Sequence, residues 1–128
     1  RFRAMVKVQG GEPRVADDPQ RFLPRAARSA ELLSPGDGFL SWLDARLVGR
    51  AGVSLGAGRD RREDAIDYGA GLLLRRKVGE RVRKGECLAE LFAADKARLA
   101  AGKELFAQAV GVSRTRPGVP PIILKVVK

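Results

Sequence analysis

The chain has 128 residues, of which 45% are hydrophobic and 31% charged, and its formal net charge at pH 7 is +10. This size and composition predict one folded domain that buries about two thirds of the surface its unfolded form would expose, and they argue against disorder over most of the chain. There is no histidine and a single cysteine, which excludes histidine-dependent catalysis, histidine zinc sites, an intrachain disulfide and a thiolate metal site, and indicates a cytoplasmic protein.

Residues 1–9 have the pattern of the last turns of a helix, because apolar residues recur at helical spacing up to a glycine pair. Residues 13–24 are predicted to be a connector, in which an aspartate caps a short helical turn that starts at Pro19. Because the chain starts at Arg1, already inside a predicted helix, we expect a piece of a longer protein.

Two strands are predicted next, over residues 29–34 and 39–43. The Pro-Gly-Asp-Gly segment at 35–38 is a strong turn signal, so the two strands should form a hairpin. In the second strand apolar residues occupy both faces, which predicts a strand that is covered on both sides.

A helix is predicted from an N-cap at Asp44 to about residue 55. Its apolar stripe recurs at every third or fourth residue, through Leu47, Val48, Ala51 and Leu55. Gly49 and Gly52 each weaken this helix by up to about 1 kcal/mol relative to alanine, so we expect them to permit the close approach of another backbone. Gly56 should end the helix in the left-handed conformation.

The second half begins with a short strand at 71–74, predicted to be buried. Residues 77–86 supply the turns of a compact β arrangement, and 87–92 form the strand that leaves it. The fold class that follows is α+β, with short, mostly antiparallel strands and two helices packed against them.

The second of these helices should run from a cap at Asp95 to about Val110, with Gly102 as an interruption. An extended segment begins at Val112, and the β-branched residues of 122–127 predict a last strand.

The glycine-rich sequence 56–59 follows the helix predicted to run from Asp44 to about residue 55, and it could form an anion-binding nest with Arg59. Phosphate loops, however, precede helices, where backbone N–H groups are free. A helix cap with a surface arginine is therefore the favoured interpretation. Glu63, Asp64 and Asp67 could coordinate Mg²⁺ or Ca²⁺, but they lack EF-hand spacing and lie beside arginines, so ion pairing and capping are favoured and no metal is expected.

Residues 77–88 together with Lys96 resemble lipoyl and biotinyl carrier domains, in which a hairpin presents a modified lysine. Lys96 lies beyond the following strand, beside the helix cap Asp95, so modification is disfavoured, although it remains an alternative function. A basic RNA-associated module is another alternative. The arginines alternate with acids, and only one Trp and one Tyr are available for stacking, so we expect no specific nucleic-acid partner and no membrane partner.

Several short segments, in the right order and with the right spacing, resemble the C-terminal domain of the pyrimidine nucleoside phosphorylases, including thymidine phosphorylase. The matching segments are Gly38-Phe39-Leu40, Asp44-Ala45, Leu47-Val48-Gly49-Arg50-Ala51, Leu55-Gly56-Ala57-Gly58-Arg59, Asp64-Ala65-Ile66-Asp67, Gly71, and Lys77-Val78-Gly79-Glu80-Arg81-Val82 with Gly85-Glu86. Residues 9–19 resemble the segment where that family's α/β domain leads into its C-terminal one.

The resemblance implies a hammerhead or barrel-sandwich hybrid in residues 29–128, with 1–28 as the end of the preceding α/β domain and a connector. The family's enzymes are pentosyltransferases that cleave pyrimidine nucleosides with inorganic phosphate as co-substrate. In that family the residues that bind phosphate and the base belong to earlier domains. We therefore expect no catalytic, cofactor-binding or metal-binding residue here, and we expect the isolated chain to be inactive. The implied partners are the helical and α/β domains of a homodimeric parent enzyme.

The loop from Gly56 to Asp67 is the one candidate functional segment. We expect it to help close a cleft over substrate, as lids do in other enzymes. The residues of this predicted lid are Gly56, Gly58, Arg59, Asp64 and Asp67.

Overall fold

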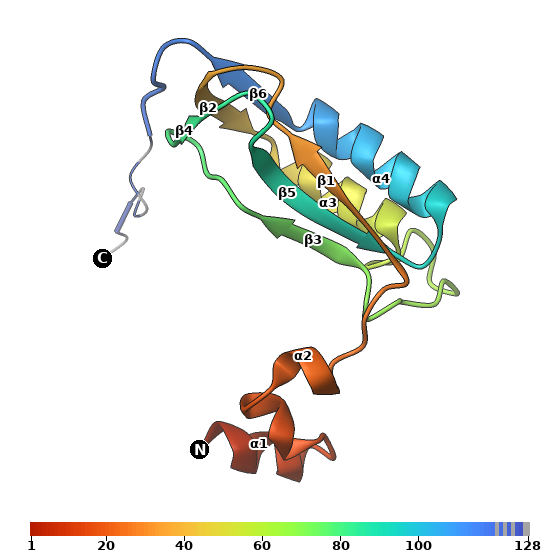
Figure 1. The fold of residues 1–128 in the computed structure, drawn as a ribbon. Helices are drawn as coiled ribbons and strands as arrows, with labels where there is room; N and C mark the ends of the chain where they lie inside the picture. The colour runs from red at the N-terminus through yellow and green to blue at the C-terminus, as the bar shows by residue number, and fades with distance from the viewer. Residues whose placement is uncertain (120, 122, 124, 127–128) are drawn as a thin grey trace.

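The computed structural model describes residues 1–119, 121, 123 and 125–126, and it confirms an α+β fold with small antiparallel sheets (Figure 1). The elements are α1 (Phe2–Val8), a 3₁₀ turn η1 (Pro13–Ala16), α2 (Pro19–Phe22), β1 (Arg28–Leu33), β2 (Gly38–Leu43), α3 (Ala45–Leu55), β3 (Gly71–Leu74), β4 (Arg81–Val82), β5 (Cys87–Ala93), α4 (Lys96–Gln108) and β6 (Val110–Ser113). The predicted strand at 122–127 falls on residues of which 122, 124 and 127 lie outside the described part, so it stays a prediction.

The strands form two three-stranded sheets, in the orders β1-β5-β3 and β4-β2-β6, and each pairing is antiparallel. Helices α3 and α4 lie side by side and cover one face of the first sheet (Figure 1). A helix pair on a sheet is a two-layer arrangement in which each layer buries its apolar face against the other.

Two buried clusters form the core. In the first, Leu55, Leu91 and Phe106 join the two helices to the first sheet, and in the second, Leu40, Val82 and Leu88 pack together. Strand β5 contributes to both, because its alternate residues point to opposite faces: Ala89, Leu91 and Ala93 belong to the first cluster, and Leu88 to the second. The two cores are therefore connected through one central strand.

The predicted hairpin between 29–34 and 39–43 is wrong. Strand β1 pairs with β5, whereas β2 pairs with β4 and β6, so the two consecutive strands lie in different sheets. The chain does turn between them, and the Ser34 hydroxyl donates to the Gly36 carbonyl within the turn (2.7 Å). The backbone N–H of Ser34, however, donates to the Glu86 carbonyl (2.8 Å), which continues the pairing with β5. Turn residues specify a change of direction, but they do not specify the pairing partner.

Two expectations about strand burial are also wrong. Among the described residues, the 71–74 strand is an edge strand that pairs only with β5, and Leu73 in it is 45% exposed. Strand β2 is covered on one face only, because Trp42 is 46% exposed. Helix α4 ends at Gln108, two residues before the predicted end, because Val110 already pairs with β2 as the first residue of β6.

The helix caps agree with prediction. The Asp44 carboxylate accepts the Leu47 N–H (2.9 Å) at the start of α3, and the Asp95 carboxylate accepts the Arg98 N–H (2.8 Å) at the start of α4. Gly56 ends α3 with φ of 107°, in the left-handed region that favours glycine.

The close contact between helices lies at a different glycine from those predicted. A Cβ atom added at Gly49 or Gly52 would meet nothing within 4 Å, so neither permits a close approach. At Gly102, which does not interrupt α4, an added Cβ would lie 2.5 Å from both Cγ and Cδ2 of the buried Leu55. Gly102 is therefore the residue that lets α4 pack against α3.

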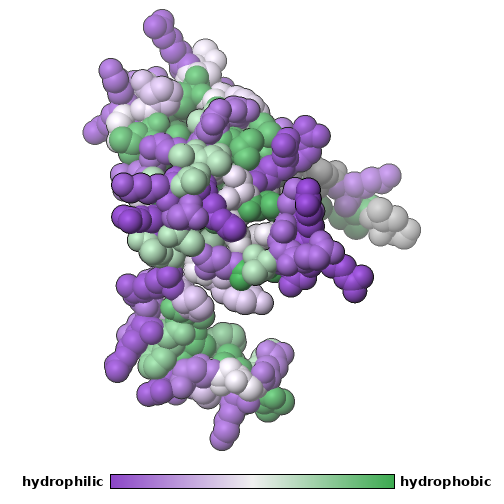
Figure 2. All heavy atoms as spheres, turned by 90° about the vertical axis from the view of Figure 1, so that its right-hand side faces the viewer, coloured by the Kyte–Doolittle hydropathy of each residue, from purple (hydrophilic) through white to green (hydrophobic). Residues whose placement is uncertain are grey.

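An N-terminal arm, made of α1, η1 and α2, packs mainly on itself and projects from the body of the domain (Figure 1). Figure 2 shows it as a separate lobe with hydrophobic side chains on its surface, and Phe2 and Met5 are each 60% exposed. The segment that leads from the arm to β1 meets the body at Gly69, where an added Cβ would lie 2.7 Å from the backbone of Arg25 and Ala26. In the described part of the chain, no helix combines the length and apolar character needed to cross a membrane.

Candidate functional site

The predicted lid is a closed loop between α3 and β3. It starts at the left-handed Gly56 and is fastened at its end, where the Asp67 N–H donates to the Gly56 carbonyl (2.9 Å). The Asp67 carboxylate in turn accepts the Gly69 N–H (2.9 Å). The two ends of the loop thus lie together, and the residues between them form its free part.

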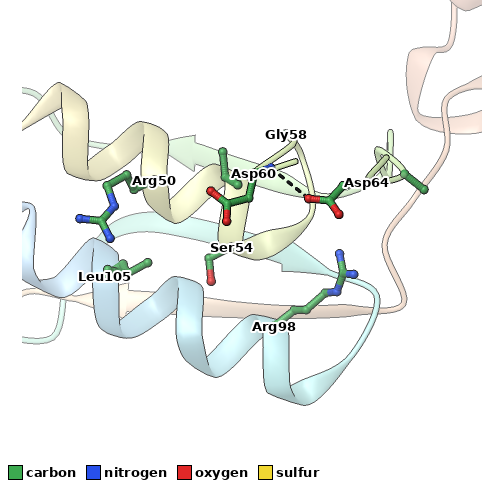
Figure 3. Close-up of a pocket in the computed structure, with 9 residues that line it drawn as sticks. Arg50, Ser54, Gly58, Asp60, Asp64, Arg98 and Leu105 are labelled. Atoms are coloured by element: carbon green, nitrogen blue, oxygen red, sulfur yellow. Dashed lines mark hydrogen bonds between the residues drawn. The ribbon is translucent and has the colours of Figure 1, made fainter. Parts of the chain in front are cut away.

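One carboxylate organises the free part of the loop. Asp64 accepts the backbone N–H groups of Asp60 (3.1 Å) and Arg61 (2.8 Å), and the first of these bonds is drawn in Figure 3. The predicted capping role is therefore confirmed for Asp64 and Asp67, whereas no hydrogen bond among the described residues involves Glu63. The predicted ion pairing is not found, because no ion pair among the described residues includes Arg59, Arg61 or Arg62.

A cavity of about 570 Å³ lies between this loop and helices α3 and α4 (Figure 3). The lining residues are Arg50, Val53, Ser54, Gly58, Asp60, Asp64, Ala65, Arg98 and Leu105. Of the predicted lid residues, Gly58 and Asp64 line the cavity, whereas Gly56, Arg59 and Asp67 do not.

Arg98 links α4 to the start of the loop. Its Nη1 lies 2.7 Å from the position that a Cβ at Gly56 would occupy, so a side chain at Gly56 would displace the guanidinium. The cation lies at the C-terminal end of α3, where the helix dipole favours positive charge. Sequence reasoning missed Arg98, Arg50 and Ser54, because the packing of two helices, and not their order in the chain, places them at the loop.

The side chains that line the cavity are better suited to holding and releasing a bound group than to breaking a covalent bond. A cation from helix α4 faces a loop carboxylate across it, as Figure 3 shows for Arg98 and Asp64. Ser54 contributes a hydroxyl, but in the described part of the chain no hydrogen bond joins it to a carboxylate that could act as a base. A nucleophile needs such a partner to be activated.

Cys87 is half-buried, and its surroundings make it unreactive. Burial, followed by the nearby carboxylates of Glu31 and Glu90, raises the pKa of the thiol, so it is protonated at neutral pH. The possible ligand atoms of these three residues lie within 4.8 Å of one another, a grouping that the sequence did not reveal because β1 and β5 pair across a long interval. Arg75 already binds Glu90 (Nε to Oε1, 2.7 Å) and neutralises it.

Lys96, the alternative carrier lysine, is the first residue of α4 and is exposed. A swinging prosthetic group requires a lysine at the tip of a tight hairpin, and Lys96 follows the helix cap Asp95 instead.

Residues 39–113 match the family model described as the pyrimidine nucleoside phosphorylase C-terminal domain. The matched residues contain both sheets except β1, both long helices and the loop. The chain therefore belongs to this family of domains, as the resemblance implied. It is 44% identical over 91 residues to a pyrimidine-nucleoside phosphorylase of Geobacillus stearothermophilus, covering 71% of this chain and 21% of the relative.

Other relatives extend this result. A pyrimidine-nucleoside phosphorylase of Bacillus subtilis (strain 168) is 42% identical over 93 residues, which cover 73% of this chain and 21% of the relative. A thymidine phosphorylase of Burkholderia cenocepacia (strain HI2424) is 35% identical over 126 residues, covering 98% of this chain and 29% of the relative. The chain thus spans between about a fifth and three tenths of the length of the relatives it matches.

Proposed function

We propose that this domain serves an enzyme that cleaves the N-glycosidic bond of pyrimidine nucleosides with inorganic phosphate, releasing a free base and a pentose 1-phosphate. The observation that carries the proposal is the family match over residues 39–113, together with relatives named pyrimidine-nucleoside phosphorylase and thymidine phosphorylase. Phosphate is the co-substrate, and no cofactor is required. The enzyme is cytoplasmic and homodimeric in this proposal.

Within such an enzyme the domain is structural and cleft-closing, and the catalytic groups come from further domains. The relatives are several times longer than this chain, which leaves room for a helical and an α/β domain. Residues 1–28 form the end of the α/β domain and a connector, and the exposed Phe2, Met5 and Val8 of α1 suit packing against that domain. The two small sheets that enclose Leu40, Val82 and Leu88 are consistent with a barrel-sandwich hybrid.

The proposal is tested by measuring phosphate-dependent release of thymine from thymidine and of uracil from uridine. A phosphorylase of the relatives' length that carries this domain should release base only when phosphate is present. The 128-residue chain alone should release none, because catalysis of this kind needs preorganised groups for phosphate and the departing base. Base release by the chain alone would contradict the proposal that the catalytic groups come from further domains. Base release by the full-length enzyme at the same rate without phosphate would contradict the proposed reaction.

The loop 56–67 is proposed to close over the substrate cleft. Support comes from its fastened ends, its exposed free part and Arg59, which is exposed and has no ion pair in the described structure. A loop of this build can move as a unit while α3 and β3 stay in place, as lids do.

Replacing Arg59 with alanine in the full-length enzyme should lower kcat/KM for thymidine by about tenfold or more, because hydrogen bonds to charged groups contribute about 1.5–3 kcal/mol. Steady-state kinetics with varied thymidine and varied phosphate measures the change. Lys103→Ala provides the control, since it removes an exposed cation from α4, away from the loop. Unchanged kinetics for Arg59→Ala would contradict the lid role without affecting the proposed reaction.

A further inference from the structure

The outer face of sheet β4-β2-β6 carries the chain's only tryptophan. Leu40 pairs with Val112, and both face the second core. Because side chains alternate across a strand, Phe39 points to the opposite face, and the irregularity between Leu40 and Trp42 places Trp42 on that face as well. Phe39 is half-buried, yet among the described residues it is not part of the packing around either core.

Trp42 lies against bare backbone. It pairs with Gly111 of β6, and a Cβ at Gly111 would lie 1.8 Å from the indole Nε1 and 2.1 Å from its Cδ1. The glycine thus lets one edge of the indole rest on the neighbouring strand, while 46% of the residue remains exposed. A half-exposed indole on a flat sheet face is a surface on which a planar ring can stack.

Unpaired cations lie next to this aromatic face. Arg81 pairs directly with Phe39 and so shares its face, and Arg83 comes directly after β4 and lines the same hollow as Arg81. Arg81, Arg83 and Lys84 line one hollow of about 620 Å³ together with Gly85 and Glu86. No ion pair in the described part of the chain includes any of the three cations. On the other flank, Arg114 is the exposed residue that follows β6.

The carboxylates near these cations already accept hydrogen bonds from backbone N–H groups and from Arg76. Glu86 accepts the Arg83 N–H (2.8 Å) and the Arg76 Nε–H (2.6 Å), and these bonds lower its pKa, the backbone bond first. Asp37 accepts the Lys84 N–H (2.9 Å). The acids that alternate with arginines in the sequence therefore hold the turns in place, and among the described residues the side chains of Arg81, Arg83 and Lys84 form no ion pair.

We propose that this face binds single-stranded nucleic acid without sequence preference. Bases stack on Trp42 and Phe39, and the phosphates meet Arg81, Arg83 and Lys84. Aromatic rings on a sheet with cations along the path of the backbone are the two requirements of such sites, and stacking requires unpaired bases, which excludes duplexes. The net charge of +10 favours a polyanion and disfavours a second copy of this chain. This activity is separate from the proposed phosphorolysis.

The chain's single tryptophan makes the test direct, because any change in tryptophan fluorescence reports this face. Titration with an oligothymidylate of about 20 nucleotides should quench Trp42, and log Kobs should fall with log salt concentration by about 0.7 for each phosphate neutralised. In the triple variant Arg81→Gln, Arg83→Gln, Lys84→Gln, binding should weaken and this slope should fall by about 2. Trp42→Ala should weaken binding at least about fivefold in the anisotropy of a labelled oligonucleotide, and Trp42→Phe should restore most of it.

A matched triple variant, Lys7→Gln, Lys96→Gln, Lys103→Gln, removes the same charge from exposed positions outside the face. It should bind nearly as well as the parent chain, and far-UV circular dichroism should show that all variants are folded. Absence of quenching, or equal weakening by both triple variants, would overturn the proposal. Quenching by poly-L-glutamate as strong as that by oligothymidylate would also overturn it, in favour of an acidic protein partner.

Discussion

Replacing Gly102 with alanine should destabilise the domain by about 1–3 kcal/mol, the usual cost of inserting a methyl group into a packed core. The result is expected although alanine is the better helix former by about 1 kcal/mol. The added Cβ would lie 2.5 Å from Cγ of Leu55, a side chain that is fully buried and has no space to retreat. Helices α3 and α4 must then separate, or Leu55 must leave its rotamer.

Urea unfolding of matched variants measures this effect. Gly49→Ala and Gly52→Ala should each raise the free energy of unfolding by up to about 1 kcal/mol, because both positions are open and only helix propensity changes. In a Leu55→Ala background, Gly102→Ala should cost much less, since the clashing atoms are gone. A Gly102→Ala variant as stable as the parent chain would show that the helices do not pack as described.

Replacing Leu88 with alanine should lower the free energy of unfolding by about 2–5 kcal/mol, as for other large buried residues. Leu88 is 2% exposed and belongs to the second core, whereas its neighbour Ala89 belongs to the first. Because β5 is common to both cores, loss of the second core should also weaken the first. The domain should therefore unfold in a single transition at a lower urea concentration.

Two probes can test that cooperativity. Far-UV circular dichroism follows mainly the helices, and the fluorescence of Trp42 follows β2 in the other sheet. The two unfolding curves of Leu88→Ala should coincide. Leu33→Ala, at a position that is 47% exposed, should change stability by less than about 0.5 kcal/mol. Separate transitions for the two probes would mean that the cores fold independently.

Local structure could be predicted from the sequence, because its causes lie within a few residues. Asp44 and Asp95 cap helices through bonds to N–H groups three residues ahead, and Gly56 ends a helix by its own conformation. The pairing of β1 with β5, and the contact of Gly102 with Leu55, depend on residues far apart in the chain. No signal in the sequence could distinguish Gly102 from Gly49, since both interrupt a helical pattern alike.

In the candidate sites, too, features with local causes could be predicted, whereas contacts between residues far apart in the chain could not. The extent of the loop 56–67 was predictable from its glycines and acids, and from the resemblance to a family. The opposite wall of its cavity was not, because Arg50 and Arg98 come from two helices that meet only after folding. In the same way, the pairing of Arg81 with Phe39 brings a cation beside an aromatic ring, where the sequence shows only alternating charges.

The contact at Gly69 ties together two parts of the molecule that the chain order separates. Gly69 lies at the fastened end of the loop, where its N–H donates to the Asp67 carboxylate, and an added Cβ at Gly69 would lie 2.7 Å from the backbone of Arg25 and Ala26. A side chain at this position would meet backbone atoms, which cannot yield by rotating as a side chain can. Glycine at position 69 is consequently what allows the end of the loop to lie against the segment that leads from the arm to β1.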